Sequence, residues 1–129
     1  MSSTPELHDI WKDLVVSMLA VNNFSLEKAW LIADGLERES LIDPDDLRRW
    51  DLEEIAFRLE RAGYKRGAHM TPLAAKRLSA LGAFVQDFSR SACEELFVTG
   101  DRESISSVLE KVVGIGPTVL RNFFLLQGR

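Results

Sequence analysis

The sequence of 129 residues has one cysteine, Cys93, and so offers no partner for an internal disulfide. A single thiol also excludes a cysteine-held zinc ion or iron–sulfur cluster, and this usage is typical of the reducing cytosol. No apolar run approaches the roughly 20 residues that a membrane-spanning helix needs. The first six residues, Met-Ser-Ser-Thr-Pro-Glu, lack the charged and apolar regions of a signal peptide. We therefore expect a cytoplasmic protein with no membrane partner and no iron–sulfur cofactor.

An excess of basic charge is also lacking, since 16 Lys and Arg residues stand against 20 Asp and Glu residues, a formal net charge of −4. That balance argues against a general polyanion binder. With 46% hydrophobic residues, the composition is that of one globular domain and excludes disordered or collagen-like chains. The charges are unevenly distributed, however. Residues 1–57 carry 13 acidic and 5 basic side chains, and residues 58–90 carry 7 basic and 2 acidic. We expect one acidic and one basic side of the molecule.

Apolar residues recur at spacings of three and four, and no stretch alternates for long enough to make a convincing strand. This pattern predicts an all-α protein: one compact, orthogonal bundle of six to eight helices over residues 1–129. Helix starts are expected at Ser25, Asp43 and Asp51, whose side chains suit the N-cap, and at Thr71-Pro72. The interpretation of Asp43 as a cap is preferred to a cation site, because the segment lacks the glycine and downstream glutamate of a calcium loop.

A few single residues have simpler expected roles. Residues 94–98 are expected to form only a short turn. Trp11 and Trp30 lie on apolar helical faces and are expected in the core. Cys93 is expected to be a small buried apolar residue. His8 and His69 have no triad pattern around a serine or cysteine and are expected on the surface.

The segment richest in chemistry is Val112-Val113-Gly114-Ile115-Gly116-Pro117-Thr118. Within it only Gly114-Ile115-Gly116-Pro117 is expected to separate two apolar helices, and Val112 is expected to belong to the first of them. Both glycines are able to adopt positive φ, and Pro117 suits the first position of a helix. Ile115 is expected to point into the core. Free amides from Gly114 to Val119 would then converge on an anion such as phosphate, with Arg121 one turn further on. The same pattern is also that of an ordinary helical hairpin with no ligand.

Residues 112–118 resemble the helix-hairpin-helix DNA-binding motif of polymerases and DNA glycosylases. Upstream, residues 14–23 followed by Lys28-Ala29 look like the first barrel helices and following loop of endonuclease III-type glycosylases. Residues 61–67 through Lys76-Arg77-Leu78 are similar to the Gly-Tyr/Tyr…Lys-Ala segment of that family. Nearly the whole chain thus resembles the helix-hairpin-helix (HhH-GPD, endonuclease III-like) DNA glycosylase superfamily. This implies a six-helix, barrel-like domain with the hairpin motif at about 103–127, and a partner of duplex DNA, damaged or intact.

The resemblance also implies particular roles. The loop Val21-Asn22-Asn23 lies where relatives insert a polar wedge into the base stack, and Tyr64 to Arg66 lie in the segment lining the other side of the DNA cleft. Backbone carbonyls at three positions would hold a monovalent cation, K⁺ or Na⁺: Glu110, Val112 and Ile115. The implied DNA-binding residues are Val113, Gly114, Ile115, Gly116, Pro117, Thr118, Val119, Arg121, Val21, Asn22, Asn23, Tyr64, Lys65 and Arg66.

Departures from the family pattern concern catalysis. Thr118 stands where bifunctional relatives have the Schiff-base lysine, so imine-based lyase chemistry is not expected. The family's catalytic aspartate lies in a stretch beyond residue 129, and no catalytic residue is assigned here. A natural DNA-binding remnant, half of a split enzyme that needs a complementing catalytic subunit, and a shortened gene product all fit the sequence.

The sequence therefore predicts a DNA-binding protein of the base-excision-repair glycosylase superfamily, located in the cytoplasm and, in a bacterium, at the nucleoid. Two alternatives stay open. One is an active monofunctional glycosylase, or half of one, in which another carboxylate assists removal of a damaged base. The other is a helical protein-interaction module that has lost DNA binding and whose acidic first half is the working face.

Overall fold

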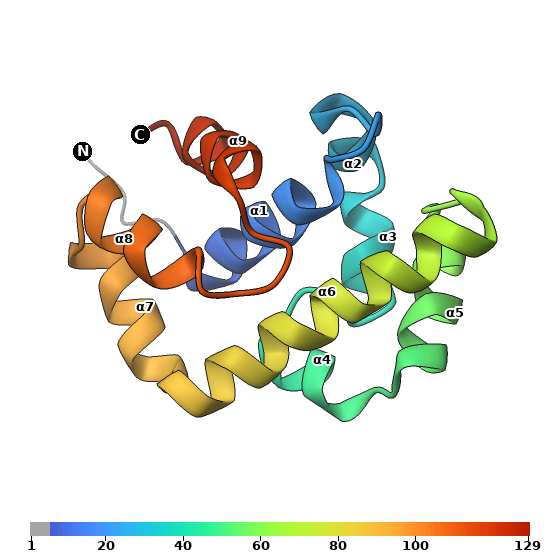
Figure 1. Cartoon of the computed structure of the whole chain (residues 1–129), viewed down its shortest axis with the longest axis horizontal. Helices are drawn as coiled ribbons and strands as arrows, with labels where there is room; N and C mark the ends of the chain where they lie inside the picture. Colours follow the sequence, from blue (N-terminus) through green and yellow to red (C-terminus); the bar gives the residue numbers. More distant parts are fainter. Residues whose placement is uncertain (1–5) are drawn as a thin grey trace.

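The computed structural model describes residues 6–129, and this part of the chain is all-α, with no strand (Figure 1). The all-α bundle predicted from the apolar spacing is confirmed. The described residues form these helices: α1 (Leu7–Leu19), α2 (Leu26–Leu31), α3 (Ala33–Arg38), α4 (Pro44–Arg49), α5 (Leu52–Ala62), α6 (Gly67–Phe88), α7 (Arg90–Thr99), α8 (Arg102–Leu109) and α9 (Pro117–Gln127).

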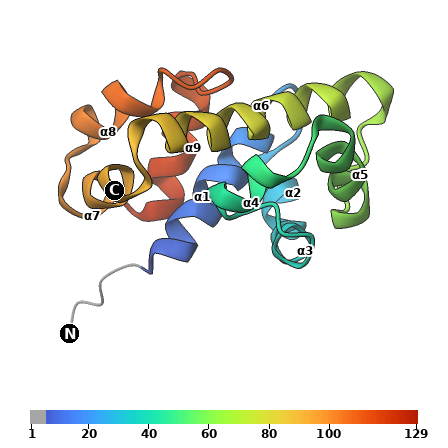
Figure 2. The ribbon, with the colours of Figure 1, turned by 90° about the horizontal axis from the view of Figure 1, so that it is seen from below.

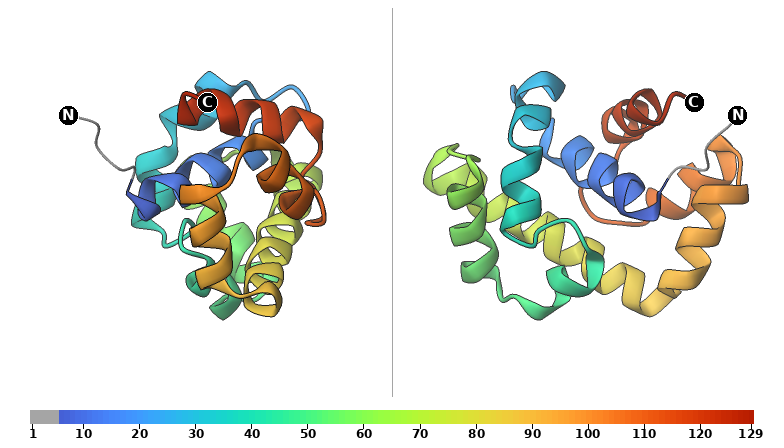
Figure 3. Two further views of the ribbon diagram at one scale, coloured as in Figure 1. Left: turned by 90° about the vertical axis from the view of Figure 1, so that its left-hand side faces the viewer. Right: turned by 180° about the vertical axis from the view of Figure 1, so that it is seen from behind.

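Helix α1 is the central helix, in contact with α2, α3, α6 and α9. From Ile10 to Leu19, every residue except Lys12 is buried, which is the pattern of a helix covered on nearly all sides. Figure 3 shows α9 lying alongside α1 on the opposite side of the molecule from α5. The aromatic residues Trp11, Phe97 and Phe123 join α1, α7 and α9, with ring centroids 5.0 and 5.9 Å apart. Truncating a fully buried ring such as that of Phe123 to alanine would cost about 3–5 kcal/mol.

Helix α6 runs along one face of the molecule, with α4 and α5 packed against one part of it and α7 following its other end (Figure 2). The buried apolar side chains of the described residues form one continuous cluster. No helix among residues 6–129 is long and apolar enough to span a membrane.

The expected N-caps are confirmed at three helix starts. The side chain of Ser25 accepts a hydrogen bond from the Lys28 amide, Asp43 accepts one from Asp45, and Asp51 accepts one from Glu54. Each cap satisfies an amide that the first turn leaves without a carbonyl partner.

The expected number of helices, six to eight, is lower than the number in the described chain. One reason is that the helix expected after Ser25 is interrupted at Ile32, whose backbone (φ −97°, ψ 6°) separates α2 from α3. The expected turn at residues 94–98 is the second reason. It is wrong, because α7 spans Arg90–Thr99 and buries Cys93 and Phe97 one helical turn apart. Ser89 caps this helix by accepting from the Ala92 amide.

Two further expectations are corrected. The long helix does not open at Thr71-Pro72 but at Gly67, so Pro72 lies inside α6 and offers no amide to the Ala68 carbonyl. Trp30 is not in the core: 44% of its surface is exposed, and the Lys12 ammonium lies 5.4 Å from its ring centroid. Cys93 is buried and His8 and His69 are exposed, as expected.

Candidate functional site

The hairpin that joins α8 to α9 is longer than the sequence pattern indicated. Helix α8 ends at Leu109, so Val112 belongs to the connection and not to the helix. Ile115 is buried as expected, and its amide donates to the Val112 carbonyl at 3.1 Å, which closes the turn. Pro117 is the first residue of α9, the position where its missing N–H costs nothing.

The two glycines of the hairpin do different things. Gly114 has φ +92°, in the left-handed region that favours glycine. Gly116 does not adopt the positive φ that its sequence context suggested, since it is an extended N-cap residue with φ −118° and ψ −168°. A Cβ atom at Gly116 would meet no other atom within 4 Å, so backbone geometry does not require glycine there.

Four amides at this end of the hairpin stay without an internal acceptor. Among the hydrogen bonds of residues 6–129, none uses the N–H groups of Gly114, Gly116, Thr118 or Val119. The first amide of α9 with a carbonyl partner is that of Leu120, which donates to Gly116 at 3.1 Å. These unused donors and the positive end of an 11-residue helix attract negative charge.

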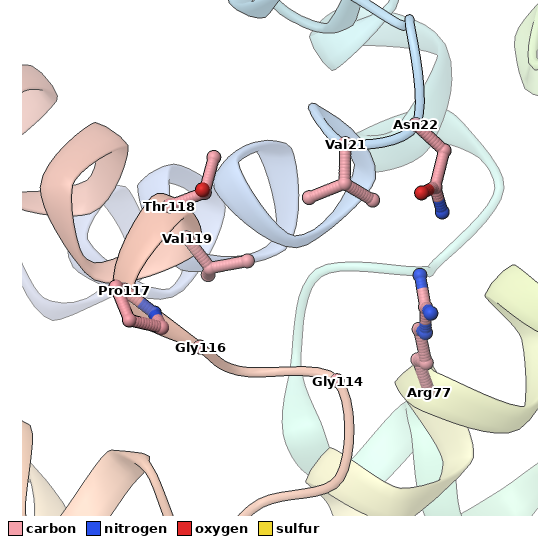
Figure 4. A pocket seen from close by; sticks show the side chains of 8 residues that line it. All are labelled: Val21, Asn22, Arg77, Gly114, Gly116, Pro117, Thr118 and Val119. Atoms are coloured by element: carbon pink, nitrogen blue, oxygen red, sulfur yellow. The ribbon is translucent and has the colours of Figure 1, made fainter.

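A pocket of about 310 Å³ lies directly beside these amides (Figure 4). The pocket brings together two segments that the sequence assigned separately, the hairpin and the loop that follows α1. It also includes one residue from α6 that was not assigned. The lining residues are Val21, Asn22, Arg77, Gly114, Gly116, Pro117, Thr118 and Val119.

Arg77 is the pocket residue that sequence reasoning missed. The aliphatic part of its side chain packs against Gly114, where a Cβ atom would lie 2.7 Å from Cγ and 2.8 Å from Cδ. In Figure 4 the guanidinium of Arg77 and the side-chain amide of Asn22 point toward one another from opposite sides of the pocket. The sequence feature that pointed to Arg77 was the basic pair Lys76-Arg77 in α6. Spacing along the chain does not determine which of the two side chains faces the hairpin.

The loop after α1 has a defined conformation. Asn22 and Asn23 both have positive φ, 56° and 71°, a region that asparagine tolerates better than most residues. The Arg66 guanidinium donates to the Val21 carbonyl at 3.1 Å and also to the Asn22 carbonyl. On the α9 side, the amide of Asn122 is 3.5 Å from the Ala20 carbonyl. Arg66 therefore holds the loop through its backbone.

The remaining predicted residues are not all in one place. Tyr64 is 1% exposed and packs edge-on against Phe24, with ring centroids 5.3 Å apart, so its place is in the core. Lys65 lines a different pocket, together with Phe57 of α5. Val113 at the bend of the hairpin and Arg121 on α9 are exposed but do not line the hairpin pocket.

The hairpin carbonyls were predicted to hold a monovalent cation. The Val112 carbonyl accepts the Ile115 amide, and Glu110 is the C-cap residue of α8. Within residues 6–129 no three His, Cys, Asp or Glu residues are grouped as metal ligands. This finding does not bear on a carbonyl site, and the cation stays a prediction.

The basic segment 58–90 is largely engaged within the protein. Arg58 pairs with Glu54, Arg61 with Glu39, and Arg66 with the loop carbonyls. Arg90 donates to Asp43 at 2.8 Å and 3.0 Å.

Burial of the Asp43 carboxyl acts to raise its pKa. The hydrogen bonds from the Arg90 guanidinium and from the Asp45 amide outweigh burial and hold this pKa below its usual range.

Lys65, Lys76 and Arg77 form no ion pair with any residue of the described chain. Of these three, only Arg77 lines the hairpin pocket.

No aspartate or glutamate lines the pocket. The arrangement is therefore a positively polarised pocket with hydrogen-bond donors on one side and a guanidinium on another, suited to an anion and without a carboxylate for acid–base chemistry. Comparison with protein-family models, with curated proteins and with solved structures gives no match for this chain, so its candidate site is described by its own geometry.

Proposed function

We propose that this protein binds duplex DNA by holding a backbone phosphate at the hairpin between α8 and α9. The observation that supports the proposal is the pocket beside the start of α9, in which four unused amides and Arg77 meet with no carboxylate. A phosphate diester presents two unesterified, charged oxygens, which such donors complement. Binding of this kind depends on the backbone and is independent of base sequence.

The overall charge of −4 does not oppose the proposal, because phosphate binding depends on the local field. Charge–dipole interactions at a helix N-terminus contribute about 0.3–1 kcal/mol when exposed. A single site of that strength is weak. We therefore expect a modest affinity that falls steeply as salt rises.

The loop Val21-Asn22-Asn23 supports a finer proposal. Val21 and Asn22 line the same pocket as the hairpin, so a duplex held by its phosphate would lie beside this loop. We include in the proposal that the loop contacts the base stack at a distorted or damaged site, as in the base-excision-repair glycosylases that the sequence resembles. A K⁺ or Na⁺ ion on the hairpin carbonyls would add a bridge to phosphate.

Base removal is not part of the proposal. The alternative of a monofunctional glycosylase needs a carboxylate in the space between the loop after α1 and the hairpin, and the pocket there is lined by none. A complementing catalytic subunit would have to supply that group.

The test is a charge reversal at the second residue of α9, with the same change at the second residue of α7 as a control. Thr118 and Ser91 are both exposed, and a glutamate in a first helical turn is favourable for the fold. We expect Thr118→Glu to weaken binding to a fluorescent duplex at 50 mM salt by tenfold or more. Ser91→Glu should stay within twofold of the parent.

Circular dichroism melting of both variants verifies the fold. Equal affinities of Thr118→Glu and the parent would refute the hairpin as the phosphate site. Absence of any duplex binding by the parent at 50 mM salt would refute the function as a whole.

A further inference from the structure

Among the basic residues of segment 58–90 that form no ion pair in the described chain, Arg77 stands out because it is partly buried and lines the hairpin pocket. Four of the seven basic residues in segment 58–90 bind carboxylates or carbonyls of the protein itself: Arg58, Arg61, Arg66 and Arg90. No hydrogen bond or ion pair within residues 6–129 involves the Arg77 guanidinium. A partly buried cation without a counterion raises the potential of the pocket that it lines.

The hairpin holds the Arg77 side chain in position. The Cβ, Cγ and Cδ atoms of Arg77 occupy the space where a side chain at residue 114 would begin, and Gly114 leaves that space free. The stem is therefore packed against the hairpin while the guanidinium extends along the pocket toward Asn22 (Figure 4). Fixing the stem lowers the entropy that a long side chain loses when its head group binds a ligand.

We propose that Arg77 is a phosphate-contacting residue, so that one backbone phosphate is held between its guanidinium on α6 and the amides at the start of α9. This inference rests on the proposed DNA-binding function and adds a specific residue to it. Arginine suits the role because its planar fork donates two parallel hydrogen bonds to phosphate oxygens, whereas a lysine offers a point charge.

The test uses Arg77→Gln, which removes the charge but keeps the three carbon atoms that pack on Gly114. Arg77→Met is a second variant that keeps the stem length without any polar head. Lys76→Gln is the matched control. It removes the same charge from the neighbouring residue of α6, which lines a small apolar pocket against α5 instead. Duplex affinity of each variant is measured between 50 and 200 mM salt.

One fewer phosphate contact lowers the slope of log affinity against log salt by about 0.9. We expect that decrease, with about tenfold weaker binding at the lowest salt, for both Arg77 variants, and a smaller change in slope for Lys76→Gln. A merely structural role of Arg77 would lower affinity without changing the slope. Arg77→Lys should recover the slope but only part of the affinity.

The outcomes separate the inference from the proposed function. If Thr118→Glu abolishes binding while both Arg77 variants retain the parent's slope and affinity, the hairpin binds DNA and the role of Arg77 is refuted. If Lys76→Gln lowers the slope as much as Arg77→Gln does, the slope reports the loss of any positive charge on α6, and the inference is also refuted. If the parent protein binds no duplex, both the role of Arg77 and the proposed DNA-binding function are refuted.

Discussion

Alanine at each of the two hairpin glycines should separate a conformational requirement from a functional one. Gly114 combines φ +92° with a Cβ position 2.7 Å from Arg77, whereas Gly116 has an extended backbone and open space around it. We expect Gly114→Ala to destabilise the protein and to displace Arg77. Gly116→Ala should leave the fold intact and place a methyl group beside the hairpin pocket.

The magnitudes follow from the two environments. An L-residue forced into the left-handed region costs about 1–2 kcal/mol, and shifting the Arg77 stem adds to that. A change of 1 kcal/mol moves Tm by roughly 3–6 °C in a domain of this size, so Gly114→Ala should lower Tm by at least about 3 °C. At Gly116 the backbone is not strained, and the less flexible unfolded chain offsets the poorer N-cap that alanine makes, so Tm should change by less than about 3 °C.

The assay is thermal unfolding of both variants at pH 7, followed by duplex titration at a temperature well below either Tm. The expected pattern is a lower Tm for Gly114→Ala only, and weaker duplex binding for both variants. A drop in Tm for Gly116→Ala equal to that of Gly114→Ala would refute the assignment of their backbone conformations. Unchanged binding of Gly116→Ala would show that no ligand approaches that backbone closely.

Four further changes have defined outcomes. Thr71→Val should raise stability by about 1 kcal/mol in a urea melt, because the buried Thr71 hydroxyl has no hydrogen-bond partner. Burial raises the pKa of Asp13, so its contribution to stability is greatest below the usual carboxyl range and is lost as pH rises through the raised pKa. Asp13→Asn can still accept from Gln127, so its Tm should decline less than that of the parent between pH 4 and pH 7. Tyr64→Phe should bind duplex with the parent's affinity, because the ring is in the core. Arg66→Gln should weaken duplex binding with an unchanged salt slope, whereas a slope lowered by about 0.9 would identify Arg66 as a direct phosphate contact.

Local signals made much of the fold predictable. The caps at Ser25, Asp43 and Asp51 depend on residues two or three positions apart, and the apolar stripe of α9 depends on one helical period. The errors arose where a local signal was incomplete. Pro72 suggested a helix start, yet packing of α6 extends the helix back to Gly67. Trp30 follows an apolar stripe, but α2 lies at the surface and leaves this ring half exposed.

The candidate site was predictable in part for the same reason. The free amides of the hairpin follow from consecutive residues, whereas Arg77 and Arg66 act on segments 37 and 45 positions away in the chain, counting to Gly114 and Val21. Which basic residue reaches a distant loop depends on helix packing, and spacing along the chain does not determine it. The basic excess of residues 58–90 therefore overstates the charge left free for a ligand, because four of the seven basic residues bind carboxylates or carbonyls of the protein itself.

The packing of α1 against α9 bears on how an acidic protein can offer an anion site at this point. Ala20, just past the end of α1, lies beside Asn122, whereas Asp13 lies beside Gln127 at the end of α9, so the negative end of α1 meets the positive end of α9. Without a cationic partner, the carbonyl groups that follow α1 would repel a phosphate bound at the start of α9. The Arg66 guanidinium binds two of those carbonyls, at Val21 and Asn22, and so offsets this repulsion. The pocket is then dominated by the amides of α9 and by Arg77, and its potential is set by these few groups and not by the net charge of the chain.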